Sequence, residues 1–179
     1  MAVFKAVQSG VEVNGETIPS FVDGMGAHQG LFREVLKKNG IADPLPVKWC
    51  SQQAWLDAFK EISEKIGPAS LKRIGSNIPQ NAKWPPDVTS IPAALQSIDA
   101  AYHMNHRKGL IGSYTCTLTG ERAATIFCDN PYPCAFDQGL IYAAAKKFAG
   151  PNDHVMVRHG EGGLCRMTGN GSCTYYVTW

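Results

Sequence analysis

The chain has 179 residues, of which 44% are hydrophobic and 18% are charged, which suits one compact domain with a substantial core. Its net charge of +2 and its lack of a long basic run argue against nucleic acid as the main partner. No apolar segment follows Met1 and no window approaches about 18 consecutive apolar residues, so we expect no secretory signal, no membrane span and a cytoplasmic location.

The first half of the chain, residues 1–89, predicts a hairpin followed by helices. Residues 11–18 alternate around Asn14-Gly15, a pair typical of a tight β-turn. A helix is expected over about 28–38. Ser51 is the N-cap candidate of a second, amphipathic helix that stops at Gly67, and Pro68 begins a shorter third helix.

The second half, residues 90–179, begins with a long helix near Ser90. We expect its apolar stripe to reach Tyr102 and to continue by one turn to His106. Strands over 114–118 and 122–128, a helix over about 135–148, and strands over 154–159 and 172–179 follow. The order strand, strand, helix, strand, strand predicts an α+β fold. We expect an antiparallel four-stranded sheet packed on helices, joined to the N-terminal helical part in a single domain over 1–179.

Cysteines are concentrated near the chain end. Four of the six follow residue 127, namely Cys128, Cys134, Cys165 and Cys173. Thiols in a reducing compartment act as core residues, metal ligands or redox groups. Spacing alone leaves a metal site and a set of buried apolar thiols both open. If a metal binds here, sulfur ligands favour zinc.

The pattern Asn130-Pro131-x-x-Cys134, a helix, a strand, and Cys165-Arg166-x-x-Gly169-x-x-x-Cys173 before an aromatic strand resembles the 4-vinyl reductase domain family. The resemblance covers about residues 90–179. It implies the ligand-binding fold shared by haem nitric-oxide sensors and Golgi trafficking subunits. Members of the family bind small hydrophobic molecules, several hold a structural zinc, and relatives pair. The resemblance therefore implies a small hydrophobic ligand, zinc as cofactor and a homodimer.

The same resemblance implies the zinc ligands. Matched by position, they are Cys134, Cys165 and Cys173. In the relatives a carboxylate just before the last cysteine pair completes the set. Glu161 lies near that position but one residue away from it, so Cys128 is the other candidate, because the Asn-Pro-Tyr-Pro elbow can fold it back toward Cys134.

A second group of side chains predicts a ligand pocket between the long helix, the sheet and the helix over 135–148. The expected ligand-binding residues are His106, Tyr102, His103, Tyr114 and Phe136. Asp99 stands four residues before His103, so its carboxylate can orient the imidazole. The alternative for both histidines is an ordinary structural role.

Together these features predict a domain that binds or senses a small hydrophobic or aromatic molecule, including a tetrapyrrole, with a structural zinc. One alternative is a reductase or an accessory protein of tetrapyrrole pigment metabolism. The chain carries no flavin or nicotinamide fingerprint and no nucleophile–base motif, so catalysis by this chain alone is not expected. Another alternative is a haem-based gas sensor that uses His103 or His106 as its iron ligand.

Overall fold

The computed structural model describes residues 2–19, 22, 25–41, 48–160 and 165–179. Its α-helices are α2 (Gln29–Lys38), α3 (Gln52–Ile66), α4 (Pro68–Asn81), α5 (Ile91–Met104) and α6 (Cys134–Lys147). Short 3-10 turns are η1 (Gly15–Thr17), η2 (Gly26–His28) and η3 (Arg166–Thr168). The strands are β1 (Glu12–Asn14), β2 (Trp49–Ser51), β3 (His106–Arg107), β4 (Ser113–Gly120), β5 (Ala123–Asp129), β6 (Met156–His159) and β7 (Cys173–Thr178). The predicted α+β class is confirmed.

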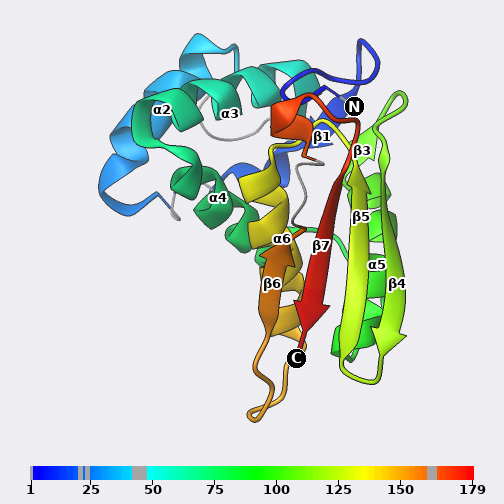
Figure 1. Ribbon diagram of the computed structural model, residues 1–179. Helices are drawn as coiled ribbons and strands as arrows, with labels where there is room; N and C mark the ends of the chain where they lie inside the picture. Colours follow the sequence, from blue (N-terminus) through cyan, green and yellow to red (C-terminus); the bar gives the residue numbers. More distant parts are fainter. Residues whose placement is uncertain (1, 20–21, 23–24, 42–47, 161–164) are drawn as a thin grey trace.

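The larger sheet has the strand order β4-β5-β7-β6, and each neighbouring pair is antiparallel. The last strand, β7, thus lies between β5 and β6, which places the beginning of β7 beside the ends of β5 and β6. Figure 1 shows α5 and α6 alongside this sheet and the helices α2 to α4 at the other side of the molecule. Ile126, Tyr175 and Val177 are fully buried on the helix-facing side of the sheet.

A smaller sheet corrects the predicted hairpin. β1 pairs with β2 and with β3, which come from distant parts of the chain, in the order β2-β1-β3. The side chain of Asn14 accepts a hydrogen bond from the backbone N–H of Glu16 and so begins the turn η1 instead of a hairpin. The chain does turn at Asn14-Gly15, as the sequence predicts. Tertiary contacts, however, determine which strands pair with β1.

Helix α5 ends earlier than expected. It begins next to Ser90, as predicted, and Ser90 is its N-cap, but Met104 is its last residue, and His106 belongs to strand β3. The amide of Asn105 donates to the carbonyls of Ala101 and Lys83, at 2.7 and 3.1 Å, and ends the helix there. His106 is therefore near Tyr102 because a strand begins after the cap, not because the helix continues.

Helices α4 and α6 approach each other closely through two glycines. A Cβ atom on Gly75 would lie 2.1 Å from the carbonyl oxygen of Phe136, and one on Gly139 would lie 2.0 Å from that of Lys72. Only glycine permits this backbone separation. The contact joins the N-terminal helices to the C-terminal sheet layer. Among the described residues, no helix is both long enough and apolar enough to cross a bilayer.

Candidate functional site

Four potential metal ligands meet at one end of the larger sheet. Cys134 is the first residue of α6, His159 ends β6, Cys165 precedes η3, and Cys173 begins β7. Their ligand atoms all lie within 4.8 Å of one another. The Sγ of Cys134 is 3.1 Å from that of Cys165 and 3.2 Å from that of Cys173, and the remaining pair of sulfurs is 3.9 Å apart.

The chemistry of this group fits a zinc ion. Three thiols and one imidazole form a complete tetrahedral ligand set, which is typical of a structural zinc site. The Nε2 of His159 is buried and has no hydrogen-bond partner among the described residues. Hydrogen bonds from the Cys134 thiol and from Arg166 lower the pKa of Cys173, whereas the contact with Cys173 and burial raise the pKa of Cys134, so a metal ion would have to displace a proton from Cys134 to bind there. With four protein ligands the shell has no open position for substrate.

The predicted ligands are placed as follows. Cys134, Cys165 and Cys173 come together, and the fourth member of the group is His159 rather than Cys128. Cys128 lies opposite Cys173 in the sheet, is fully buried, and burial raises the pKa of its thiol. Glu161 lies outside the described residues. Sequence reasoning missed His159; the available signal was a histidine at the end of the strand, six residues before Cys165.

Arg166 connects the four potential ligands Cys134, His159, Cys165 and Cys173, here called the metal-ligand group, to buried residues of the interior. Its backbone N–H and its Nε donate to the Sγ of Cys173 at 3.3 and 3.4 Å. Its guanidinium also forms an ion pair with Asp137 and donates to Oδ1 of Asn130 at 2.6 Å. The side chains of Arg166 and Asp137 are 0% exposed. Burial and the Asp137 charge act in opposite directions on the Arg166 pKa, and the net direction is upward, so the guanidinium stays charged.

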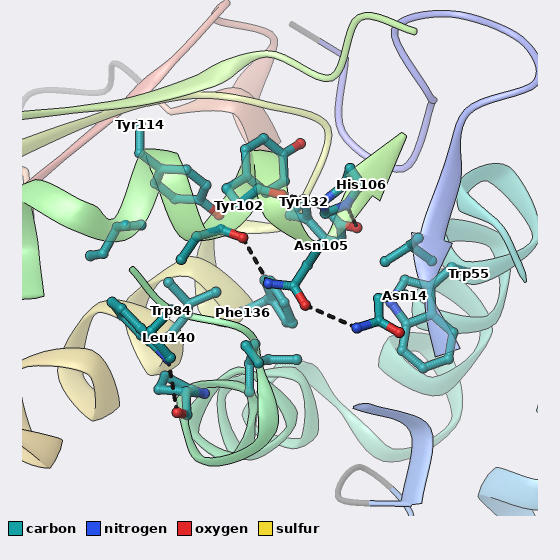
Figure 2. A pocket seen from close by; sticks show the side chains of 16 residues that line it. Asn14, Trp55, Trp84, Tyr102, Asn105, His106, Tyr114, Tyr132, Phe136 and Leu140 are labelled. Atoms are coloured by element: carbon teal, nitrogen blue, oxygen red, sulfur yellow. Dashed lines mark hydrogen bonds between the residues drawn. The ribbon is translucent and has the colours of Figure 1, made fainter. Parts of the chain in front are cut away.

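A central cavity of about 60 Å³ lies between the N-terminal helices and the sheet layer. Figure 2 shows its wall, to which most of the predicted ligand-binding residues contribute. Those residues are Tyr102, His106, Tyr114 and Phe136; Trp55, Trp84, Asn14, Asn105, Tyr132 and Leu140 also line the cavity. Four of the five predicted residues thus line one cavity, and their role in ligand binding stays a prediction. The sequence patterns did not indicate Tyr132, Asn14 or Asn105.

His103 does not face this cavity. It is exposed, and its Nδ1 lies 2.9 Å from the backbone oxygen of Asp99 and 3.4 Å from the Asp99 carboxylate. The expected contact with Asp99 is present, but it holds the ring at the surface of α5. The ring therefore lies on the side of the helix away from the cavity.

His106 lies within the cavity wall with both ring nitrogens bonded. Nδ1 lies 2.8 Å from the carbonyl oxygen of Tyr102, and Nε2 lies 2.8 Å from the hydroxyl of Tyr132. Because a carbonyl only accepts, Nδ1 carries the proton and Nε2 accepts from the tyrosine. Burial lowers the His106 pKa to about 4. The imidazole is therefore neutral at physiological pH.

The other polar groups around the cavity are bonded as well. The hydroxyl of Tyr102 donates to the carbonyl of Ile111 at 2.7 Å, and that of Tyr114 donates to Asp137 at 2.6 Å. The Nδ2 of Asn14 donates to Oδ1 of Asn105 at 3.1 Å, a contact drawn in Figure 2. Burial raises the pKa of both tyrosines, so they remain neutral hydrogen-bond donors.

The residues around this cavity do not fit a haem in this conformation. A cavity of about 60 Å³ is smaller than the roughly 150 Å³ that holds a benzene molecule and far below the roughly 300–1,000 Å³ of ordinary ligand pockets. Aromatic rings fill the interior, with centroids of Phe59 and Phe136 5.2 Å apart and those of Tyr132 and Phe136 4.8 Å apart. Both nitrogens of His106 are bonded within the protein, so neither is free to ligate iron.

Comparisons with known proteins give a likeness in structure only. No protein-family model matches the chain, and no curated protein matches its sequence. The assignment to the 4-vinyl reductase family is therefore unsupported.

Solved H-NOX structures match nearly the whole chain. An H-NOX protein from S. oneidensis, in the Fe(II) ligation state, superposes with a TM-score of 0.69 at 14% identity, covering 92% of this chain and 95% of its own. The Fe(II)NO state of an H-NOX protein from the same organism gives 0.68 at 14% identity, with coverages of 92% and 97%. An oxygen-binding H-NOX domain related to soluble guanylate cyclases gives 0.60 at 17% identity, with coverages of 92% and 94%. The chain has the H-NOX fold.

Proposed function

We propose that this chain is a sensor domain on the H-NOX fold, with a zinc ion held by Cys134, His159, Cys165 and Cys173. The observation that carries the proposal is that four soft or borderline ligand atoms, from four separate chain segments, lie within 4.8 Å of one another. A closed Cys₃His shell makes zinc a structural ion. It would tie the start of α6 to the end of β6 and the beginning of β7.

The signal molecule of this sensor is a small hydrophobic compound that enters the central cavity. The cavity wall comes from both halves of the chain, because Trp55 and Ile78 lie on α3 and α4 while Ile98 and Leu140 lie on α5 and α6. A ligand larger than the present volume of about 60 Å³ would have to separate those helices. Binding would thus change the relative position of the two layers, which is what a sensor needs.

A haem-based gas sensor is the second candidate, and the comparisons favour it over the zinc-centred proposal. The H-NOX relatives include proteins described in Fe(II), NO, CO and oxygen-bound states. The interior of this chain has to open before a haem could enter, and His106 would have to leave Tyr102 or Tyr132. The two candidates differ in whether the cavity takes a tetrapyrrole or a smaller compound.

One preparation tests both candidates. The chain is expressed with a haem precursor, purified without added metal, and analysed for zinc, for iron and for the Soret absorption band of bound haem. The zinc-centred proposal expects one zinc per chain and no such band. A stoichiometric haem band replaces the small-compound candidate with the gas sensor, and absence of zinc from fully reduced protein rejects the metal centre.

Single variants test the ligand set. Cys165→Ser is expected to lose zinc, because it removes one of the three sulfurs. Cys128→Ala is the matched control: it removes a neighbouring buried thiol that is outside the group. Equal zinc loss in both variants would contradict the proposed ligands.

Two further expectations accompany the proposal. Zinc thiolates require reduced cysteines, which the cytoplasm maintains, so a cytoplasmic location agrees with the proposed centre. We also propose a homodimer, and light scattering coupled to size-exclusion chromatography measures it directly. A monomeric mass at every protein concentration measured would reject the dimer.

A further inference from the structure

One buried side chain, Arg166, links the metal-ligand group to two residues, Asp137 and Asn130, that hydrogen-bond to tyrosines of the cavity wall. The guanidinium of Arg166 donates through Nε to Cys173 on one side. Its two terminal nitrogens donate to Asp137 and to Asn130 on the other. A planar guanidinium holds its donors in a fixed fork, so these partners move together or the hydrogen bonds break.

The first branch from Arg166 reaches the cavity through Asp137. One oxygen of that carboxylate accepts from Arg166, and the other accepts from the hydroxyl of Tyr114 at 2.6 Å. The Tyr114 ring lines the cavity and packs against Tyr102 with ring centroids 5.1 Å apart. Asp137 is fully buried, so water cannot substitute for either hydrogen bond.

The second branch reaches the cavity through the Asn130-Pro131-Tyr132-Pro133 elbow. Oδ1 of Asn130 accepts from Arg166 and also from the backbone N–H of Tyr132, at 2.6 and 2.9 Å. The Tyr132 ring lines the cavity, and its hydroxyl bonds to His106. Arg166 thus supports two separate tyrosines of the cavity wall.

We infer that Arg166 couples the metal centre to the cavity, so that a change in the hydrogen bonding of the cavity wall alters metal binding at the cysteines. The inference rests on the proposed zinc centre. A metal ion fixes Cys173, Cys173 accepts from Arg166, and Arg166 positions Asp137 and Asn130. Coupling between two sites is reciprocal, so loss of metal would loosen Tyr114 and Tyr132, and displacement of those rings would weaken metal binding.

Two buried tyrosines provide a matched test. Tyr102 and Tyr114 both line the cavity, both are buried, and both donate their hydroxyl. Only the Tyr114 hydroxyl bonds to Asp137; that of Tyr102 bonds to the carbonyl of Ile111. Tyr114→Phe therefore breaks the branch that runs through Asp137, while Tyr102→Phe removes an equivalent hydroxyl beside it.

The measurement is competition for Co²⁺ and for Zn²⁺ between the reduced full-length chain and a chromophoric chelator. The d–d spectrum of bound Co²⁺ reports sulfur coordination. Tyr114→Phe is expected to lower metal affinity by about fivefold or more, the lower end of typical coupling between sites, and to change the Co²⁺ spectrum. Tyr102→Phe is expected to leave both unchanged. Melting temperatures of both variants separate this effect from general destabilisation.

Arg166→Lys is a further test that keeps the charge but removes the fork. Loss of such a supporting hydrogen bond typically weakens metal binding by about 10–100-fold, and that range is expected here. Arg158→Lys, at an exposed position on β6, is the control and should bind metal normally.

The outcomes are distinct. Equal affinities and spectra for the two tyrosine variants would overturn the coupling, whether or not Arg166→Lys folds. A wild-type chain that binds neither Co²⁺ nor Zn²⁺ through its cysteines would overturn the metal centre, and the coupling with it.

Discussion

The Nε2 of His106 lies 2.8 Å from the hydroxyl of Tyr132, inside a wall that joins strand β3 to the elbow before α6. The opposite side of the ring donates to the carbonyl of Tyr102. The imidazole is neutral here because burial disfavours its charged form and lowers its pKa to about 4. Protonation of Nε2 would reverse its hydrogen bond with the tyrosine and leave a positive charge in the buried wall, which costs free energy.

Acid is expected to destabilise the fold through His106. Its pKa is about 4 in the folded protein against about 6.5 for an unfolded histidine. Between these values the unfolded chain binds more protons, so the free energy of unfolding falls as pH decreases from about 6.5 to about 4. The loss from this one group approaches roughly 3 kcal/mol at pH 4.

Urea denaturation at pH 7 and at pH 4.5 measures that loss. His106→Gln is expected to reduce the difference in unfolding free energy between the two pH values. The exposed His103 is the control, and His103→Gln should retain the wild-type difference. An unchanged pH dependence in His106→Gln would assign the acid sensitivity to other groups.

Substitution of the two interhelical glycines is expected to be costly. Gly75→Ala and Gly139→Ala would each place a methyl group about 2 Å from a backbone oxygen of the facing helix. Because backbone atoms cannot rotate away, α4 and α6 would have to separate, at about 1–3 kcal/mol or more. Thermal or urea unfolding measures the loss.

Gly30 in α2 is the matched control for these variants. A Cβ atom there meets nothing within 4 Å, and Gly30 lies in the first turn of α2, so Gly30→Ala should leave the stability unchanged or raise it slightly. If all three alanine variants had the same stability, the close contact between α4 and α6 would be wrong.

Removal of one partner of the buried ion pair is expected to have a large effect. Asp137→Ala leaves the Arg166 guanidinium charged and buried, which typically costs about 3–5 kcal/mol. Asp153→Ala breaks a pair with Arg122 at the surface, at 2.6 Å, in which the Arg122 side chain is 54% exposed. Its effect on the unfolding midpoint should be much smaller, because water replaces the lost partner. Similar midpoints for the two variants would contradict the burial of Arg166.

Metal removal is expected to lower the melting temperature. If the folded chain alone binds zinc, free zinc at 1,000 times its dissociation constant adds about 4 kcal/mol to stability. At about 2–4 °C per kcal/mol for a chain of this size, chelation under reducing conditions should lower the midpoint by roughly 8–16 °C. Cys173→Ala should show no response to chelator, whereas Cys128→Ala should respond as the wild type does.

Local sequence determined much of the secondary structure. Ser51 caps α3 as expected, and α5 begins next to Ser90 as expected, because the side chain of each serine accepts from the backbone N–H three residues later. Alternating apolar residues predicted the strands β4, β5, β6 and β7, and helical spacing predicted α6 between them. Each of these patterns depends only on neighbours along the chain. The three cysteines that meet at the end of the sheet are those that the resemblance implied as ligands, whereas their spacing alone left a metal site and a set of buried apolar thiols both open.

Only the tertiary structure decided the rest. β1 takes its partners from residues about 40 and 90 positions away, a choice that turn chemistry at Asn14-Gly15 does not contain. His159 joins the cysteines because β7 inserts between β5 and β6. The volume of the cavity depends on how Phe59, Tyr132 and Phe136 pack together. Sequence patterns specify which faces are apolar, but side-chain packing across distant segments determines whether those faces enclose a ligand or fill the space themselves.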